Sequence, residues 1–271
     1  MIGLALPERL RLRYAKLGKV RFTSQRDLAR VMERAMRRAT LPLAHSAGFS
    51  PRPLVSFGLA LPTGCASRAE YLDLRLDPSR ATDAVGIVGL DDVDVGELAR
   101  FTSRMSELLP DGIDVTAAAG LTGAEPSLQE AVASCDWELE VLGVSPAVLA
   151  GRVEQLLEAD AVQVARERKG RIATDDIRPA IRALSVLDRP RREIDGLGEV
   201  VTLAASLSTH PRGVRPAELC GALGSEVLLV GACRTHQWME NDDRTARAEP
   251  LTEDGTVCGG LPDRAIEVQD G

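Results

Sequence analysis

A stretch of apolar residues at helical spacing, with arginines off its apolar side, constrains the fold of this chain more than any other feature. Ser24 is a typical N-cap, and Asp27 stands three residues later, as in a capping box. Leu41-Pro42 ends the pattern. The apolar stripe consists of Leu28, Val31, Met32, Ala35, Met36 and Ala39. The pattern predicts an amphipathic helix that packs one face on a core and turns its arginines to water.

Alternating apolar and polar residues on both sides of this helix predict strands. They cover 11–23, with an interruption at Leu17-Gly18, and the short runs 54–64, 70–76 and 113–117; a second helix is expected over 90–109. The order β-α-β-β-α-β is typical of a ferredoxin-like domain. We therefore expect an N-terminal domain over residues 1–120, followed by a linker over 121–134 that is rich in small residues.

The rest of the chain repeats this order with one additional strand. Strands are predicted over 137–142, 162–168, 181–187, 200–207 and 227–233, and helices over 146–157 and 216–223. We expect a second ferredoxin-like domain over 135–239 and a flexible acidic tail over 240–271, where no period is visible. The predicted fold class is α+β, with two tandem ferredoxin-like domains.

Charge is distributed unevenly along the chain. The formal net charge is −7, yet residues 11–60 hold eleven Lys and Arg against only Asp27 and Glu33, a local charge of +9. Residues 1–10 cancel, so the remainder of the chain carries −16. Such a polarised molecule attracts phosphate-rich or acidic partners to one side.

Composition excludes several classes of function. Aromatic residues make up only 3% of the chain, which argues against a platform of stacked rings for single strands. No apolar run approaches the roughly 20 residues of a membrane helix, and the N-terminus lacks the pattern of a signal peptide. The five cysteines are far apart, so we expect free thiols, no metal site and no bound cofactor in a cytoplasmic protein.

Two further segments have chemistry of interest. The loop Ser46–Pro53 combines hydroxyls, a glycine, two prolines and Arg52, a set suited to gripping a phosphate or equally to a plain structural turn. It lacks the spacing of a P-loop. The run 166–171 predicts a basic hairpin tip. His45 stands beside Ser46 in the loop after the basic helix, and an enzymatic role would pair it with Ser46, Asp27 or Glu70.

The first seventy residues resemble a known family. Shared motifs are Phe22-x-Ser24-x-x-Asp27-Leu28, Glu33-Arg34-Ala35-x-Arg37-Arg38-Ala39, Leu41-Pro42, Ser46-x-Gly48-Phe49-x-Pro51-x-Pro53, Pro62-x-Gly64 and Ala69-Glu70-Tyr71-Leu72-Asp73. Further matches are Arg168-Lys169-Gly170-Arg171, Asp176-Ile177-Arg178-Pro179 and Arg215-Pro216. Over roughly residues 10–240 the chain resembles the DUF2344 family, also called the radical SAM-linked protein family.

This resemblance implies an accessory role in RNA metabolism or modification beside a B12-binding radical SAM protein. Family members often carry histidine where this chain has Gln25 and Arg52, which disfavours essential histidine chemistry here and leaves phosphate contact intact. We therefore expect an RNA-binding protein, with rRNA or tRNA as its ligand and no membrane partner. The residues expected to contact RNA are Arg26, Arg30, Arg34, Arg37, Arg38, Ser46, Arg52, Arg168, Lys169 and Arg171.

Two alternatives stay open at this stage. One is a protein-interaction module that docks on a radical SAM partner through the apolar segment Leu54–Leu61. The other is an enzyme acting on a small substrate with His45. The sequence does not choose between catalysis and binding.

Overall fold

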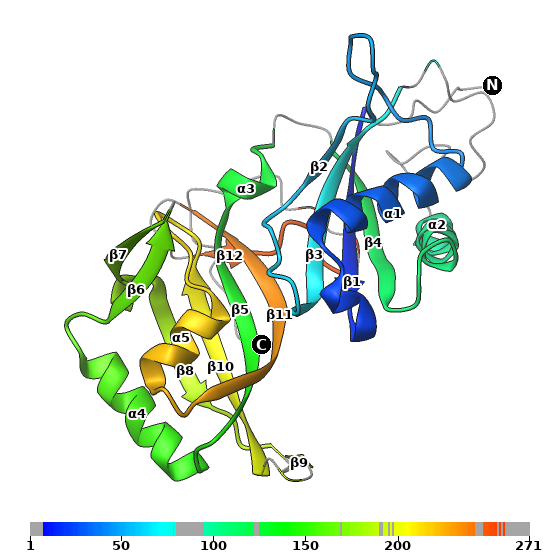
Figure 1. The fold of residues 1–271 in the computed structure, drawn as a ribbon. Coiled ribbons are helices and arrows are strands. Elements are labelled where there is room, and N and C mark those ends of the chain that lie inside the picture. Colours follow the sequence, from blue (N-terminus) through cyan, green and yellow to red (C-terminus); the bar gives the residue numbers. More distant parts are fainter. Residues whose placement is uncertain are drawn as a thin grey trace, which may run out of the picture. The chain divides into compact units, whose positions relative to one another are not determined.

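The fold is that of a computed structural model, which describes residues 8–77, 79, 95–121, 125–168, 170–189, 192–194, 196, 198–241, 246–253, 255 and 257. The chain forms two compact units. Unit 1 comprises Met1–Thr63, Ser67–Val132 and Gln237–Gly271, and unit 2 comprises Gly64–Ala66 and Ala133–His236. The mixed α+β class expected from the sequence is confirmed (Figure 1).

Unit 1 contains a β-α-β-β-α-β series of elements. These are β1 (Arg9–Lys16), α1 (Gln25–Arg38), β2 (Val55–Phe57), β3 (Ala66–Arg75), α2 (Val95–Glu107) and β4 (Ile113–Leu121), with a 3₁₀ turn η1 (Gly18–Phe22) after β1. The strands follow the order β4-β1-β3, and β2 pairs with residues 72–74 near the C-terminal end of β3. All these pairs are antiparallel.

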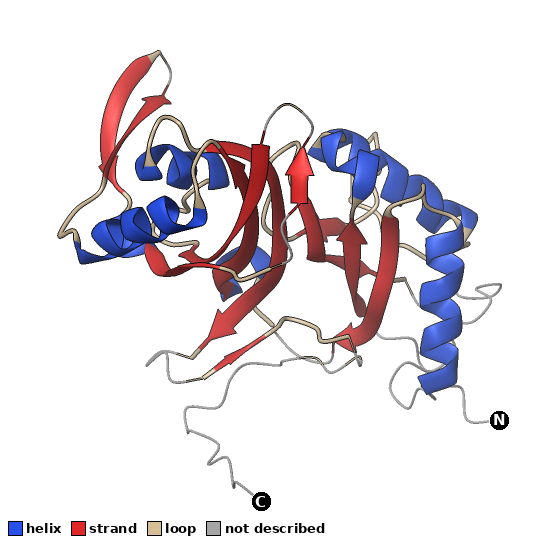
Figure 2. Cartoon of the chain, turned by 90° about the horizontal axis from the view of Figure 1, so that it is seen from below, coloured by secondary structure: helices blue, strands red, loops and turns tan. Residues whose placement is uncertain are grey.

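The sheet of unit 1 separates two different environments. On one face, Leu10, Leu12 and Tyr14 of β1 lie in a core with α1 and α2. The two helices therefore cover the same face, as Figure 2 shows. On the other face, Arg11 and Arg13 alternate with those apolar residues and are also buried. One face of the strand is thus apolar and the other is charged.

Unit 2 contains a longer series of strands. Its elements are β5 (Val132–Leu142), α4 (Pro146–Glu158), β6 (Gln163–Arg168), β7 (Arg171–Asp176), η3 (Arg178–Ala180), β8 (Ile181–Val186), β9 (Arg192–Ile194), β10 (Gly198–Ser208), α5 (Pro216–Leu223) and β11 (Leu228–Glu240). Its main sheet has the order β11-β5-β10-β8. The strand predicted over 162–168 forms, but β6 pairs only with β7 in a separate hairpin. The tandem ferredoxin-like repeat stays a prediction.

The structure differs from the predicted domain division at two places. Residues 128–131 of the expected linker form the short helix α3 (Leu128–Ala131), which runs directly into β5. Leu128 is buried because it packs with Tyr71 and Leu251 in a small apolar cluster. Residues 128–134 of the expected linker are thus regular structure, in α3 and the start of β5.

The expected tail also returns to unit 1. Residues 246–253, here called the return segment, include β12 (Arg247–Ala248), which pairs with the end of β11. Leu251 has no exposed surface, and Arg247 stacks on Trp238 with 4.3 Å from its guanidinium carbon to the ring centroid. Glu249 and Glu253 of this segment both pair with the buried Arg13, which explains why a polar run with no period is nevertheless ordered here.

Candidate nucleic-acid interface

Helix α1 forms as the sequence predicted. The Ser24 hydroxyl accepts a hydrogen bond from the Asp27 amide at 3.2 Å and donates one to the Asp27 carboxylate at 2.7 Å. This donated bond, together with the nearby arginines, lowers the pKa of Asp27 below its ordinary value. Leu28, Met32 and Met36 are buried against the sheet of unit 1. The cap and the apolar stripe therefore fix both the start and the orientation of the helix.

The opposite side of α1 carries five exposed arginines, which we call the arginine face. They are Arg26, Arg30, Arg34, Arg37 and Arg38. At 3.6 residues per turn their directions fall within about 120° around the helix axis, roughly opposite the buried stripe. Twelve residues separate the first from the last, a length of about 18 Å along the axis.

Most of the arginine face is free of carboxylate partners. Arg30 forms an exposed ion pair with Asp27 at 3.2 Å. Among the described residues no carboxylate lies within 4 Å of the guanidinium groups of Arg26, Arg34, Arg37 or Arg38. An unneutralised row of guanidinium groups is the usual contact surface for a phosphate backbone. The face is the convex outer side of one helix.

The loop that follows α1 is a narrow hairpin. Ser46 and Arg52 close it, because the Ser46 amide donates to the Arg52 carbonyl at 2.8 Å and the Arg52 amide donates to the Ser46 hydroxyl at 3.1 Å. His45 and Pro53 form a β-bridge next to this pair. Arg52 is exposed and Ser46 is half-buried. The Ser46 oxygen therefore has a structural role as an acceptor within the loop.

The His45 side chain has a backbone contact within its own loop. Its Nδ1 lies 2.9 Å from the Leu43 carbonyl oxygen, and the neighbouring Ala44 amide bonds to Arg75 at the end of β3. Glu70 lies five residues earlier on β3, about 17 Å along the strand. Asp27 lies at the opposite end of α1, which is about 20 Å long. The pairing of His45 with Asp27 or Glu70 stays a prediction.

The apolar segment 54–61 does not form an exposed docking loop. Most of its apolar side chains are turned inward: Leu61 is buried, and Val55 and Phe57 are half-buried against the core. Within it, β2 pairs with Leu72–Leu74 of β3. The segment completes the sheet of unit 1, and its residues 54–56 also line a shallow groove, so partner docking through it stays a prediction.

The third group of predicted RNA contacts belongs to unit 2. The hairpin β6–β7 has the expected position, and Arg168 pairs with Arg171 across its end. Lys169 and the side chains of Arg168 and Arg171 lie outside the described residues. The structure therefore says nothing of how these three residues relate to the arginine face.

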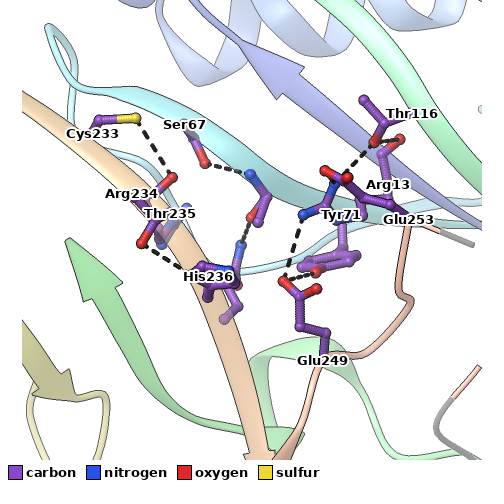
Figure 3. Close-up of polar contacts among 12 residues, drawn as sticks. Arg13, Ser67, Tyr71, Thr116, Cys233, Arg234, Thr235, His236, Glu249 and Glu253 are labelled. Atoms are coloured by element: carbon purple, nitrogen blue, oxygen red, sulfur yellow. Dashed lines mark hydrogen bonds and ion pairs between the residues drawn. The ribbon is translucent and has the colours of Figure 1, made fainter. Parts of the chain in front are cut away.

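Sequence reasoning overestimated the positive surface of unit 1. Of the eleven basic residues in 11–60, Arg11, Arg13 and Lys16 are buried. Arg11 pairs with Asp73. Arg13 lies 2.6 Å from Glu253 and 3.6 Å from Glu249 (Figure 3). Because side chains alternate between the two faces of a strand, Arg11 and Arg13 of β1 lie on the face away from α1. No local sequence pattern indicated which carboxylates would pair with them.

A shallow groove of about 460 Å³ lies beside this charged face. Arg9, Asp73 and Glu125 line it together with residues of β2. Arg9 is already paired with Asp73 at 3.3 Å and with Glu125 at 3.2 Å. Arg9 is thus neutralised by protein carboxylates, and Arg75 is the other arginine that lines the groove. The groove presents fewer guanidinium groups than the arginine face, which makes it a poorer site for a row of phosphates.

Metal binding and membrane crossing find no support in the described part of the chain. No cluster of three or more His, Cys, Asp or Glu side chains able to hold a metal ion occurs among those residues. Over the same ranges, no helix has the length and apolar character needed to cross a bilayer.

Comparisons with known proteins give one clear result. No curated protein matches the chain. Among solved structures, a chain of the "Crystal Structure of a Cbf5-Nop10-Gar1 Complex" is similar over 84% of this chain and 48% of that chain, with 9% identity and a TM-score of 0.41. This chain therefore spans about half the length of that one, at a similarity too weak to support an argument.

A family model described as "Uncharacterized protein conserved in bacteria (DUF2344)" matches residues 9–216. Since this match covers most of the chain, the protein belongs to the DUF2344 family.

Proposed function

We propose that this protein binds RNA through the arginine face of α1 and acts as an accessory factor for RNA-processing or RNA-modifying machinery. The observation that carries the proposal is the row of exposed guanidinium groups, four of them without a carboxylate within 4 Å among the described residues. RNA as the polyanion, and a radical SAM enzyme or a nuclease as the partner, follow from the family resemblance.

The length of the arginine face matches a row of phosphates along one nucleic-acid strand, whether that strand is single or part of a duplex. Phosphates along one strand of a duplex are about 3.4 Å apart on the axis, so roughly 18 Å of helix matches about five of them. The guanidinium groups stand on a rigid helix, because its opposite side is anchored in the core. Less side-chain and backbone freedom is then lost on binding than for arginines on a mobile tail.

The charge of the remaining chain supports a localised contact. Net charge is −7 overall although the arginine face is positive. A polyanion is therefore repelled by most of the molecule and attracted to one side, which directs encounter toward α1. We expect weaker non-specific binding than for a uniformly basic protein of the same size.

The salt dependence of RNA binding tests this proposal. Fluorescence anisotropy with a labelled 20-nucleotide RNA, measured from about 50 to about 300 mM KCl, gives the slope of log K against log salt. The double variant R34A/R37A should bind more weakly. Its slope should be shallower by about 0.7 for each phosphate of the single strand that the two arginines no longer neutralise.

A charge-matched control removes two other exposed arginines. Arg189 and Arg192 are each paired with a carboxylate, Glu138 and Glu140. The R189A/R192A variant lowers net charge by the same amount but should leave the slope unchanged. Equal slopes for wild type and R34A/R37A, or binding that is independent of salt, would contradict the proposal.

A further inference from the structure

Phe49 has an unusual position for an aromatic residue. Its side chain is more exposed than in an extended reference peptide, at 110%. It is one of only four phenylalanines in the chain. A ring in this position has no packing role within the protein, so both of its faces are open to a ligand.

The loop presents this ring on a stiff support. The residues on either side of the tip are joined by the Ser46–Arg52 bonds and, one step further, by the Leu54 amide bonding to the Ala44 carbonyl at 2.8 Å. Pro51 restricts the return of the chain. Gly48 has φ of 125°, a conformation that other residues rarely adopt. In Figure 1 this hairpin extends beyond the end of β2.

Another exposed phenylalanine shows the contrast. Phe22 is 61% exposed, but the guanidinium carbon of Arg21 lies 4.8 Å from the centroid of its ring. That ring already has a cation–π partner within the protein. Among the described residues, no aromatic or cation–π contact is formed by Phe49. Its faces are available to a second planar group.

The charge around the loop favours an anionic ligand. Between Glu33 and Glu70 the sequence has no acidic residue, but it has Arg34, Arg37, Arg38, Arg52 and Arg68. A ligand that is both polyanionic and aromatic combines the two properties of this stretch. Single-stranded nucleic acid has phosphates for the arginines and unpaired bases for the ring.

We propose that Phe49 stacks on an unpaired nucleobase and that the substrate class of this protein is single-stranded RNA. This inference rests on the proposed function and deepens it, because the arginine face alone does not distinguish a single strand from a duplex. The phosphates of the strand lie along α1, and one base at the end of the contact is held by the ring. Bases inside a duplex are stacked on one another and are not accessible to it.

The F49A variant tests this inference. With a labelled single-stranded 20-nucleotide RNA, F49A should lower affinity by about 5- to 150-fold, the range found for removal of one base–aromatic stack. The slope of log K against log salt should not change, because every arginine that neutralises a phosphate is still present. With a 20-base-pair RNA duplex, F49A should bind like the wild type.

Two further variants separate stacking from other roles of the ring. F49W should retain single-strand affinity, whereas F49L, which keeps an apolar side chain without a ring face, should be as weak as F49A. F22A is the matched control and should bind normally. The midpoint temperature of thermal unfolding should be the same for the wild type and all variants at position 49, since this side chain makes no contact in the core.

Each contrary result has its own meaning. Wild-type affinity of F49A, with R34A/R37A impaired, overturns the stacking role and leaves the proposed function standing. Full affinity of F49L overturns stacking, because an apolar side chain without a ring face then suffices. A partner complex that survives RNase treatment but is lost in F49A also overturns it, in favour of apolar insertion into a partner protein. If the wild type binds neither RNA, the proposed function itself fails.

Discussion

Arg11 and Asp73 face each other across β1 and β3, and the guanidinium group donates hydrogen bonds of 2.7 and 2.9 Å to the two carboxylate oxygens. Arg11 is only 1% exposed. Asp73 also accepts a bond from Arg9 at 3.3 Å. The Asp73 carboxylate thus pairs with two arginines on the charged face of the sheet. Arg11 also donates a hydrogen bond to the Pro250 carbonyl oxygen at 3.3 Å.

Replacing Asp73 by asparagine should destabilise the protein strongly. The side-chain shape is kept, but Arg11 becomes a buried charge without a counter-ion, which typically costs about 3–5 kcal/mol. Urea unfolding followed by circular dichroism measures the change in the free energy of unfolding. The control R30A breaks an ion pair of similar type whose side chains are 59% and 56% exposed, and should cost at most about 1 kcal/mol. A D73N protein as stable as R30A would contradict this account.

The buried phenol of Tyr71 predicts a loss of stability at alkaline pH. Burial, and then the negative charge of Glu249, raises the pKa of Tyr71 above its ordinary value of 10.0, although Arg13 acts in the opposite direction. The hydroxyl donates to Glu249 at 3.1 Å, a bond that only the neutral phenol makes. Above pH 10 the unfolded chain loses this proton and the folded protein keeps it, so the free energy of unfolding falls as pH rises.

Comparison of the wild type with Y71F isolates this contribution. Unfolding free energies measured between pH 8 and 11 should fall more steeply in the wild type, with an additional slope of up to about 1.4 kcal/mol per pH unit above pH 10. All other ionisable groups are the same in the two proteins, so their contributions cancel in the difference. Parallel curves for the two proteins would show that Tyr71 ionises normally in the folded state.

The sequence was sufficient where structure depends on near neighbours. Helix α1 was predicted within one residue at its start because a cap and an apolar stripe are both local signals. The exposure of its five arginines followed from the same periodicity. The strand β5 alternates in burial along most of its length and was found for the same reason. The strand β3 was found from its alternating sequence, although residues 69–74 are all buried in the structure.

The sequence was insufficient where partners are distant in the chain. Arg13 meets Glu253 across a separation of 240 residues, and Tyr71 meets Glu249 across 178. The return segment has no period of its own, so composition predicted a mobile tail. It is ordered by charges on β1 and by Leu251, neither of which a local pattern identifies as a contact. The same reason explains why Arg11 and Arg13 were counted with the positive surface.

The turn before β4 depends on a glycine. Gly112 has φ of 91°, and a Cβ at this position would lie 2.4 Å from the Leu17 carbonyl oxygen. That carbonyl belongs to backbone, so the clash cannot be relieved by a side-chain movement. G112A should lower the free energy of unfolding by about 2 kcal/mol or more.

Gly151 is the matched control for this substitution. It lies within α4, and a Cβ there meets no atom within 4 Å. G151A should therefore stabilise the protein by up to about 1 kcal/mol, since alanine is the better helix former. Chemical denaturation of the two variants should give shifts of opposite sign; shifts of the same sign would contradict the assigned roles of the two glycines.

Leu251 should hold the return segment in place although it lies beyond the family match. Its side chain has no exposed surface and packs with Ala69, Tyr71 and Leu128. L251A should cost about 2–5 kcal/mol, because it leaves a cavity in that cluster. The control L228A makes the same chemical change at a side chain that is 57% exposed and should shift the free energy of unfolding by no more than about 0.5 kcal/mol. Release of the segment in L251A should also make residues 246–253 sensitive to protease at concentrations that leave L228A intact. Equal stability and equal cleavage of the two variants would mean that residues 246–253 form a dispensable tail, and the buried arginines of β1 would then need other partners.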